Sequence, residues 1–393
     1  MENGEEVDIS LDWRKNRRVG YDHLDDFMMS LDFPAFIPGL KLCEYFYVEA
    51  VRPILEDHFS GVPHSAARFD YGSDVLGFDT PLSRDHGWGP KVMLFLTQKD
   101  YEDYKDQISE VMANELPTEI RGYPTNYDVP FSGDGCMQAV AHGPVRHWVA
   151  VTTIPSFFRH YLGVDPTGPI SDVDWLIMPQ QHLRTIISGK VFHDGLDQLQ
   201  GVRNRLRWYP RDIWYYLLAN QWRRIDQEEP FMARCGHVGD ELGSRIVATR
   251  QIVEIMHLCF LIEKQYAPYY KWFGAAFGLL NCAPDLNPIF HRVLESNHWK
   301  DRERYFSDAF LILMEMHNRL SVTPAIEPKV SSFYNRPYQV PHSARYVDAL
   351  HGAIQSDVVR GFPRNVGSMG QFVDSTDILS DPGWGKVFKT IYQ

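Results

Sequence analysis

The sequence lacks the cysteine spacing that marks zinc and disulfide proteins. Its 393 residues include only five cysteines, and no two of them form a CxxC pair. Neither a structural zinc site nor a disulfide framework is indicated. We expect the cysteines to be small apolar side chains in a reducing compartment. Internal repeats and low-complexity linkers are also missing from the sequence, so repeat architectures are not expected.

Long apolar runs and an excess of basic residues are missing as well. No stretch approaches about eighteen uninterrupted apolar residues, which a membrane span requires. The first residues, MENGEEVDISLDWRKNRR, lack the apolar core of a signal peptide. We therefore expect a cytoplasmic protein without a membrane partner. Lys and Arg number 39 against 51 Asp and Glu, a net charge of −12, which disfavours DNA binding while leaving a local basic groove open.

Hydrophobic residues make up 44% of the chain and aromatic residues 13%, which is too rich for a disordered protein. The length predicts two or three packed units. The predicted organisation is a polar extension at 1–32, an α/β domain at 33–172, a helical domain at 173–325, and a mixed C-terminal segment at 326–393 that packs back on the cleft.

Apolar periodicity predicts an α+β protein, with a small sheet first and helices after it. An amphipathic helix is expected from residue 36 until Pro53 ends or kinks it. Strands are expected at 92–96 and 147–154, with a helix at 100–114 between them. A short helix is expected at 21–31. Later helical segments are predicted at 179–190, 195–206, 210–227, 239–265, 268–280, 286–297 and 300–320. One apolar stripe of the fourth segment comprises Leu242, Ile246, Val253, Met256 and Phe260.

The most informative stretch is YGSDVLGFDTPLSRDHGWGPK at residues 71–91. Gly72 and Ser73 form a small pair, and Asp85 follows Ser73 by twelve residues, just before a predicted strand. This is the nucleotidyltransferase arrangement, in which small residues let backbone N–H groups approach a triphosphate. Carboxylates on the next strand then hold divalent ions. We take Asp85, His86 and Ser73 as catalytic candidates in this stretch, and Gly72, Asp79 and Trp88 as substrate-binding candidates.

The chain departs from the arrangement in two ways, because the second carboxylate is missing and the predicted strand at 147–154 offers no third. Gly87 stands where a second metal-binding carboxylate is expected, so a Mg²⁺ site at Asp85 lacks a ligand. The structural alternative is ordinary turn chemistry, in which Gly and Asp shape loops.

Five long stretches carry a family resemblance: FIPGLKLCEYFYVEAVRPIL, YGSDVLGFDTPLSRDHGWGPKV, QWRRIDQEEPFMARCGHVGDELGSRIVATR, YAPYYKWFGAAF and GSMGQFVDSTDIL. They resemble domain-of-unknown-function family 4037, a group placed near the nucleotidyltransferase fold. The resemblance implies a small mixed sheet with flanking helices and a helical C-terminal domain, similar to aminoglycoside nucleotidyltransferases. Lys271 looks like the phosphate contact of those enzymes' Lys-Trp segment, although it also suits a surface lysine.

A looser resemblance links the chain to fungal enzymes that make arginine-containing cyclodipeptides from aminoacyl-tRNA. No single motif carries it. It implies a tRNA-borne donor and an arginine substrate.

Two groups of charged residues suggest substrate contacts. Glu228, Glu229, Asp240 and Glu241 form an acidic group that suits a guanidinium or ammonium ligand, with Glu229 also a catalytic candidate. Helix capping and i,i+4 pairing are the structural alternative for Asp240 and Glu241. The basic group suits a phosphate backbone or, alternatively, a solvated helix face; it comprises Arg203, Arg205, Arg207 and Arg211.

The C-terminal stretch GSMGQFVDSTDIL adds Gln371 and Asp374 as substrate-binding candidates. A polar tail of this kind is expected to fray unless it completes a site. Three functional hypotheses follow. The first is a transferase on a nucleotidyltransferase-like scaffold, with a cationic acceptor and a nucleotide or tRNA-borne donor. The second is an aminoacyl-tRNA-dependent synthase of arginine-containing cyclodipeptides, and the third is a non-catalytic binding module.

Overall fold

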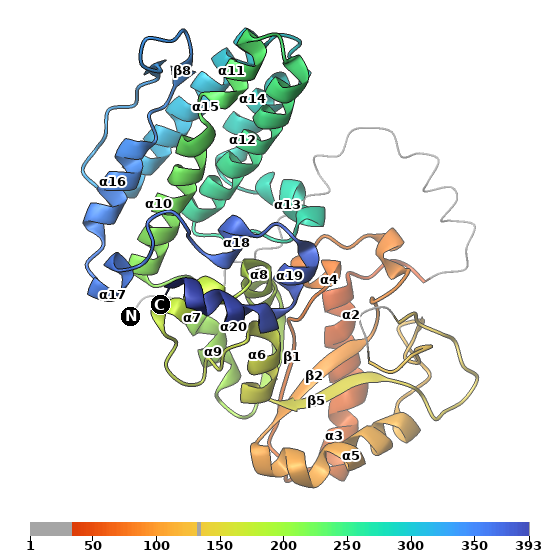
Figure 1. Ribbon diagram of the computed structural model, residues 1–393. Helices are drawn as coiled ribbons and strands as arrows, with labels where there is room; N and C mark the ends of the chain where they lie inside the picture. Colours follow the sequence, from red (N-terminus) through yellow and green to blue (C-terminus); the bar gives the residue numbers. More distant parts are fainter. Residues whose placement is uncertain (1–33, 132–134, 393) are drawn as a thin grey trace, which may run out of the picture. The chain divides into compact units, whose positions relative to one another are not determined.

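The computed structural model describes residues 34–131 and 135–392 (Figure 1). The predicted extension at 1–32 and its helix at 21–31 lie outside the described residues. The chain divides into two compact units. The first comprises Met1–Pro169 and His182–Arg207, and the second comprises Ile170–Gln181 and Trp208–Gln393. Across the described part of the chain, no helix is long and apolar enough to cross a bilayer.

The first unit is built on a four-stranded mixed sheet in the order β5-β2-β1-β6. Strand β1 (Ser65–Arg68) is antiparallel to β2 (Lys91–Leu96) and to β6 (Lys190–Asp194). Strands β2 and β5 (Trp148–Thr153) are parallel. A parallel pair needs a long crossover connection, which includes helix α5 (Gln98–Glu115).

The predicted strands at 92–96 and 147–154 and the helix between them are confirmed by β2, β5 and α5. Strands β1 and β6 were not predicted. The sequence of β1 is Ser-Ala-Ala-Arg, which holds no β-branched or aromatic residue. The five residues of β6 lie between the helices predicted at 179–190 and 195–206, and the first of these predictions includes its first residue.

The first long helix changes its hydrogen bonding near Pro53. Helix α2 (Gly39–Phe46) continues into a π-helical turn, η2 (Tyr47–Val51), and then into α3 (Arg52–His58). Proline has no N–H to donate to the preceding turn, and a π-turn is one way for a helix to continue past it. The predicted kink therefore takes the form of a change in helical pitch.

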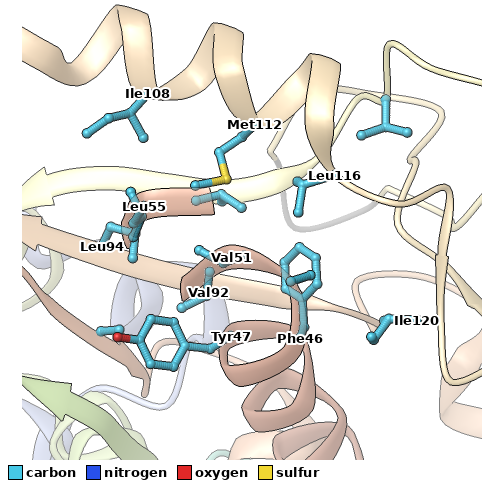
Figure 2. Packing of buried hydrophobic residues seen from close by; sticks show 14 of the residues in the cluster. Phe46, Tyr47, Val51, Leu55, Val92, Leu94, Ile108, Met112, Leu116 and Ile120 are labelled. Carbon is cyan, nitrogen blue, oxygen red and sulfur yellow. The ribbon is translucent and has the colours of Figure 1, made fainter. Parts of the chain in front are cut away.

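This helix and α5 enclose one face of the sheet (Figure 2). Phe46 and Val51 project from the first helix toward Val92 and Leu94 of β2, and Met112 projects from α5. All five side chains are buried, so their apolar area is a main source of stability for this unit. The remaining elements of the unit are α4 (Ser73–Leu76), η3 (Pro81–Arg84), β3 (Glu119–Ile120), β4 (Tyr123–Pro124), α6 (Ile154–Leu162) and α9 (Leu199–Arg205). Helix α8 (Gln180–Ser188) begins in the second unit and ends in the first.

The second unit is mainly helical. Helix α10 (Arg211–Glu228) packs against α12 (Glu241–Ile262) and α16 (Ala344–Ala353), and α14 (Ala283–Glu295) packs against α15 (Trp299–Leu320). The remaining elements are α7 (Asp172–Ile177), α11 (Phe231–His237), α13 (Tyr270–Phe277), β7 (Ser331–Ser332), β8 (Gln339–Val340), α17 (Asp357–Arg360), α18 (Met369–Phe372), α19 (Thr376–Ser380), η4 (Pro382–Trp384), α20 (Gly385–Phe388) and η5 (Lys389–Tyr392).

The predicted stripe on α12 is only partly buried. Phe260 is buried, whereas Leu242 is 72% exposed and Ile246 is 60% exposed. Helix α12 packs against α10, α11, α14 and α15, so its buried surface is not confined to one stripe. The predicted fold class is confirmed: a mixed sheet with flanking helices is followed by a helical region.

Candidate functional site

The turn after β1 brings two candidate residues to one edge of the sheet. Gly72 has φ +140°, a conformation that L side chains rarely adopt, and Ser73 begins α4. A Cβ at Gly72 would overlap the Asp74 carboxylate. The glycine therefore lets Asp74 fold back toward β1. Because β1 and β2 are antiparallel, this turn and the segment that leads into β2 lie at the same sheet edge.

A buried group of charged side chains lies beneath this turn. The Arg68 guanidinium contacts Asp70, and its Nη2 lies 3.2 Å from Asp74 Oδ2. All three side chains are almost fully buried. Arg68 Nε has no hydrogen-bond partner among the described residues. The two carboxylates and the guanidinium carry a formal net charge of −1, and the ion pairs offset part of the cost of burying them.

Lys91 belongs to the same edge, because it opens β2 and lies opposite Trp148 of β5. Its ammonium lies 5.1 Å from the Trp148 ring and 5.5 Å from the Tyr71 ring, and it donates to the backbone oxygen of Gly87. Burial, with a smaller effect of the Arg68 charge, lowers the pKa of Lys91 to about 7. A buried lysine that titrates near neutrality is unusual and occurs often at functional sites.

Asp79 and Trp88, both predicted to bind substrate, are buried and bonded to each other. Asp79 Oδ2 accepts hydrogen bonds from Trp88 Nε1 at 2.9 Å and from the backbone N–H of Gly39 at 2.6 Å. Burial raises the pKa of Asp79. In the described structure this pair joins the end of the loop to the start of α2.

The segment from Asp85 to Trp88 is held through the backbone of Asp85 and Gly87 and through the side chain of Trp88. Cys136 Sγ donates to the Asp85 carbonyl at 3.0 Å, and the N–H of Gly87 donates to Gly135 O at 2.8 Å. Lys91 donates to Gly87 O, and Trp88 is bonded to Asp79. The loop is therefore ordered by contacts from three other segments of the first unit.

The two polar side chains of this loop remain in solvent. The Asp85 side chain is 64% exposed and that of His86 is 58% exposed. Asp85 Oδ2 lies 2.9 Å from His86 Nδ1. This leaves Nε2 as the imidazole nitrogen that is not engaged by the carboxylate, and a carboxylate in this position orients the ring for proton transfer.

The residues at this edge do not fit the metal centre that the resemblance implies. Asp85 is bonded to a histidine, and Gly87 supplies no ligand. Among residues 34–131 and 135–392, no group of three or more His, Cys, Asp or Glu side chains is arranged to hold a metal ion. We therefore derive no step through Mg²⁺.

The acidic group of the second unit is engaged in contacts with its own helices. Asp240 caps α12 by accepting from the N–H of Gly243 at 2.8 Å, and Glu241 is paired with the buried Arg302. Glu228 Oε2 lies 3.0 Å from Arg250 Nε. The predicted cap at Asp240 is thus present, whereas Glu241 pairs with Arg302 and not at i,i+4 with Arg245, which donates to Asn297 Oδ1.

Glu229 lies at the N-terminus of α16. It accepts a hydrogen bond from the N–H of Ser343 at 3.1 Å. Burial raises its pKa to about 7, and the nearby Asp226 charge adds to this effect. Glu229 is thus a half-buried carboxyl group whose titration is shifted toward neutrality.

The four arginines predicted to bind nucleic acid are distributed between the two units. Arg203 donates to the carbonyls of Ile186 and Ile187 at 2.9 and 2.7 Å. Arg205 donates to Gly168 O at 2.6 Å, and Arg211 bonds to Asp212 and Gln355. Arg207 is exposed. Three of the four guanidiniums therefore already serve contacts within the chain.

The C-terminal candidates lie in the second unit. Gln371 Nε2 donates to Leu217 O at 3.0 Å and to Gln221 Oε1 at 2.9 Å. Lys271 lies 5.4 Å from the ring of Trp272. Burial raises the pKa of Tyr270, and the charges of Glu254 and Asp374 add smaller effects.

Gln371 also lines a pocket of the second unit. The pocket holds about 270 Å³ of empty space, part of it open to solvent. Its lining residues are Gln180, Leu217, Gln221, His257, Leu261, Ser368, Gly370 and Gln371.

One stretch of the chain matches a known family. Residues 175–273 match the model of Domain of unknown function (DUF4037). The predicted resemblance is confirmed over this segment, about a quarter of the chain. No curated protein matches the chain. A solved structure of a nucleotidyltransferase-like protein from Exiguobacterium sibiricum 255-15 aligns over 70% of this chain and 75% of its own, at 12% identity and a TM-score of 0.29. A likeness at that TM-score carries no structural argument.

The DUF4037 segment contains five of the eight pocket-lining residues, including Gln221 and His257. The sheet edge with Gly72 and Asp85 lies outside it. Sequence reasoning missed Lys91 and Arg68 at that edge. Each is a charged residue at the end of a short strand. That position could have been noticed in the sequence, but charged residues there are usually solvent-exposed, so it did not indicate burial.

Proposed function

We propose that the protein is a transferase whose reacting groups are the Asp85 and His86 side chains. The observation that supports this is the loop at 85–88, whose backbone is held from several sides while its two polar side chains remain exposed. A rigid loop that displays an oriented acid–base pair is typical of catalytic sites. Gly72 and Ser73 lie at the same sheet edge, and we propose that they bind the donor substrate.

The proposed chemistry is acyl or phosphoryl transfer to a nucleophile of the acceptor. His86 Nε2 takes a proton from the attacking amine or hydroxyl, and Asp85 stabilises the imidazolium that forms. The nucleophile then bonds to the electrophilic carbon or phosphorus of the donor. The bond to the donor's leaving oxygen breaks, and that oxygen receives the proton from His86.

The donor is proposed to be a nucleotide or a tRNA-borne group, and the acceptor to carry a cationic amine or guanidinium. The net charge of −12 favours a cationic ligand over an anionic one. The carboxylates of Asp240 and Glu241 are engaged in a helix cap and an ion pair, so an acceptor contact there would compete with these interactions.

A second candidate is an aminoacyl-tRNA-dependent synthase of arginine-containing cyclodipeptides. The misfit of the sheet edge to a metal centre favours it. An aminoacyl ester is already activated, so positioning and proton transfer suffice for the reaction.

The test is an assay with both classes of donor. The protein is incubated with ATP, CTP, GTP or UTP plus Mg²⁺ and arginine amide, and separately with charged tRNA pools, and products are identified by mass spectrometry. Nucleotidyl adducts indicate the first donor class, and RNase-sensitive diketopiperazines indicate the second. His86→Gln and Asp85→Asn are expected to lower the rate about 10²–10⁴-fold.

The matched control is His58→Gln. His58 Nε2 lies 2.7 Å from Glu115 Oε2, so it belongs to another partly exposed His–carboxylate pair of the first unit. This variant should keep the rate. Full activity of both Asp85→Asn and His86→Gln would refute the assignment, and ligand binding without any product would identify a binding module.

A further inference from the structure

Residues 328–347 carry a local excess of positive charge in an otherwise acidic chain. The stretch contains no Asp or Glu, and it contains Lys329, Arg336 and Arg345, whereas the whole chain has a net charge of −12. It includes the hairpin formed by β7 and β8. A basic segment at the surface attracts polyanions.

The positive charge of this stretch is not cancelled by ion pairs within the described part of the chain. The side chains of Lys329 and Arg336 are exposed. Arg345 donates to the backbone oxygens of Glu327 and Lys329, both at 2.9 Å, and these acceptors carry no formal charge. The three cations are therefore free of a directly bonded carboxylate.

The stem of the hairpin is fixed to two helices of the second unit. Tyr338 is buried, and its ring lies 5.6 Å from that of His237 on α11 and 6.3 Å from that of Trp299 on α15. Glu303 of α15 accepts the N–H of Gln339 at 2.9 Å. The hairpin therefore has a fixed place on the helical unit, at the end where α11 and β8 are labelled (Figure 1).

The tip of the hairpin displays an aromatic ring. Tyr334 is 84% exposed, and its ring makes a T-shaped contact with that of Phe333 at 4.8 Å. Its φ of +54° is a conformation that Gly or Asn usually adopts and that is strained for a bulky side chain. A strained side chain in solvent adds nothing to the core, so the strain points to a function at the tip. Arg336 follows in the same turn, where its N–H donates to Phe333 O at 3.1 Å.

We propose that this hairpin binds single-stranded nucleic acid, with Tyr334 stacking on a base and Lys329 and Arg336 contacting the phosphates. The phosphates match the uncancelled cations, and every base has a flat face that can stack on a tyrosine ring. An acidic peptide or an anionic membrane would use the cations and leave the exposed ring without a role. The proposal goes beyond the transferase proposed for the first unit and does not depend on it.

The experiment measures the binding of a short fluorescent oligouridine to the full chain, by fluorescence anisotropy at several salt concentrations. The comparison ligand is an abasic strand with the same number of phosphates, because it keeps the charge and lacks the bases. Oligouridine should bind about fivefold or more tightly than the abasic strand, since stacking adds to the phosphate contacts.

Four variants separate stacking from charge. Tyr334→Ala should weaken oligouridine binding about fivefold or more without changing that of the abasic strand, and Tyr334→Phe, which keeps a ring, should keep the affinity. Arg336→Gln should weaken the binding of both strands and reduce the slope of log affinity against log salt concentration by about 0.7. Lys99→Gln is the matched control, because it removes one charge from a side chain of the first unit that is 80% exposed, and it should leave binding unchanged.

Equal binding of the two strands to the wild-type chain would overturn the proposal, a result that does not depend on the folding of any variant. Absence of binding by both strands, or wild-type affinity of Tyr334→Ala for oligouridine, would overturn it as well. Tighter binding of polyglutamate or of anionic vesicles than of oligouridine would assign the hairpin to another polyanion, against the proposal. None of these outcomes affects the assay of Asp85 and His86, so the two proposals fail separately.

Discussion

The Asp79 carboxylate and the Trp88 indole form a buried hydrogen bond of 2.9 Å between Oδ2 and Nε1. Both side chains are at most 3% exposed. The same oxygen receives the N–H of Gly39, which begins α2. One carboxylate thus connects the loop at 85–88 to the first helix of the core.

Removing the indole donor should destabilise the first unit. In Trp88→Phe the aromatic packing is largely kept, while Asp79 loses one of its two donors inside the protein. We expect the free energy of unfolding to fall by about 1–3 kcal/mol, measured by chemical denaturation. Trp384→Phe is the control, because Trp384 is 44% exposed. An equal effect of the two substitutions would mean that the Asp79 bond contributes nothing.

The buried Lys91 should make the free energy of unfolding depend on pH in the neutral to alkaline range. Its pKa is about 7 in the folded chain, against an ordinary value of 10.5. Between these values the unfolded chain binds the proton and the folded chain does not. The unfolded state therefore binds more protons, so the free energy of unfolding rises as pH increases from about 7 to 10.5.

Lys91→Met should flatten this rise, because methionine has no proton to bind. The measurement is a series of denaturant titrations between pH 7 and 10. Lys99→Met serves as the control, since the Lys99 side chain is 80% exposed, and should leave the slope as in the wild type. If Lys91→Met keeps the wild-type slope, Lys91 is protonated in the folded protein.

The sequence predicted those parts of the fold that depend on local pattern. Strand β2 is a short continuous apolar run, helix α5 buries Ile108 and Met112 at i,i+4, and the cap at Asp240 follows from its place before an apolar run. Strand β1 was not predicted because its four residues have low strand propensity and gain their place through pairing with β2 and β6.

Some residues of the candidate site could likewise be predicted from local pattern, and others could not. Gly72, Ser73 and the 85–88 loop could be located from the spacing of small and acidic residues. The bond between Asp79 and Trp88 could not, because it depends on how η3 turns the chain between them. The environment of His257 depends on Gln371, which follows it by more than one hundred residues, so no local pattern reports it.

A half-buried histidine pair should make the first unit sensitive to acid. The rings of His64 and His193 lie 5.0 Å apart, and His64 Nε2 lies 3.0 Å from Tyr47 Oη. Burial, with a smaller effect of His193, lowers the pKa of His64 from 6.5 to about 4. Between these values only the unfolded chain binds the proton at His64, so stability falls as pH decreases through this range.

His64→Asn should reduce this loss of stability between pH 6.5 and 4.5 by about 1–2 kcal/mol, allowing for the partial exposure of the ring. Other buried histidines titrate in the same range, so the informative quantity is the difference between variant and wild type. His142→Asn changes an exposed histidine and should not alter the dependence. An identical acid dependence of His64→Asn and wild type would contradict the assignment.

Gly72 and Gly77 offer a matched pair for the turn at the sheet edge. Both have positive φ, +140° at Gly72 and +75° at Gly77. A Cβ at Gly77 would meet no atom within 4 Å, whereas one at Gly72 would overlap the Asp74 carboxylate. Gly77→Ala should therefore cost about 1 kcal/mol of stability, from backbone conformation alone.

Gly72→Ala should cost more, about 2–4 kcal/mol, because backbone strain is joined by displacement of Asp74 from Arg68. The comparison uses thermal and chemical unfolding of the two variants. The excess over Gly77→Ala should shrink when Asp74 is replaced by alanine in both backgrounds, since the overlap is then removed. An excess that persists without Asp74 would show that the conformation of Gly72, and not its contact with the carboxylate, determines the cost.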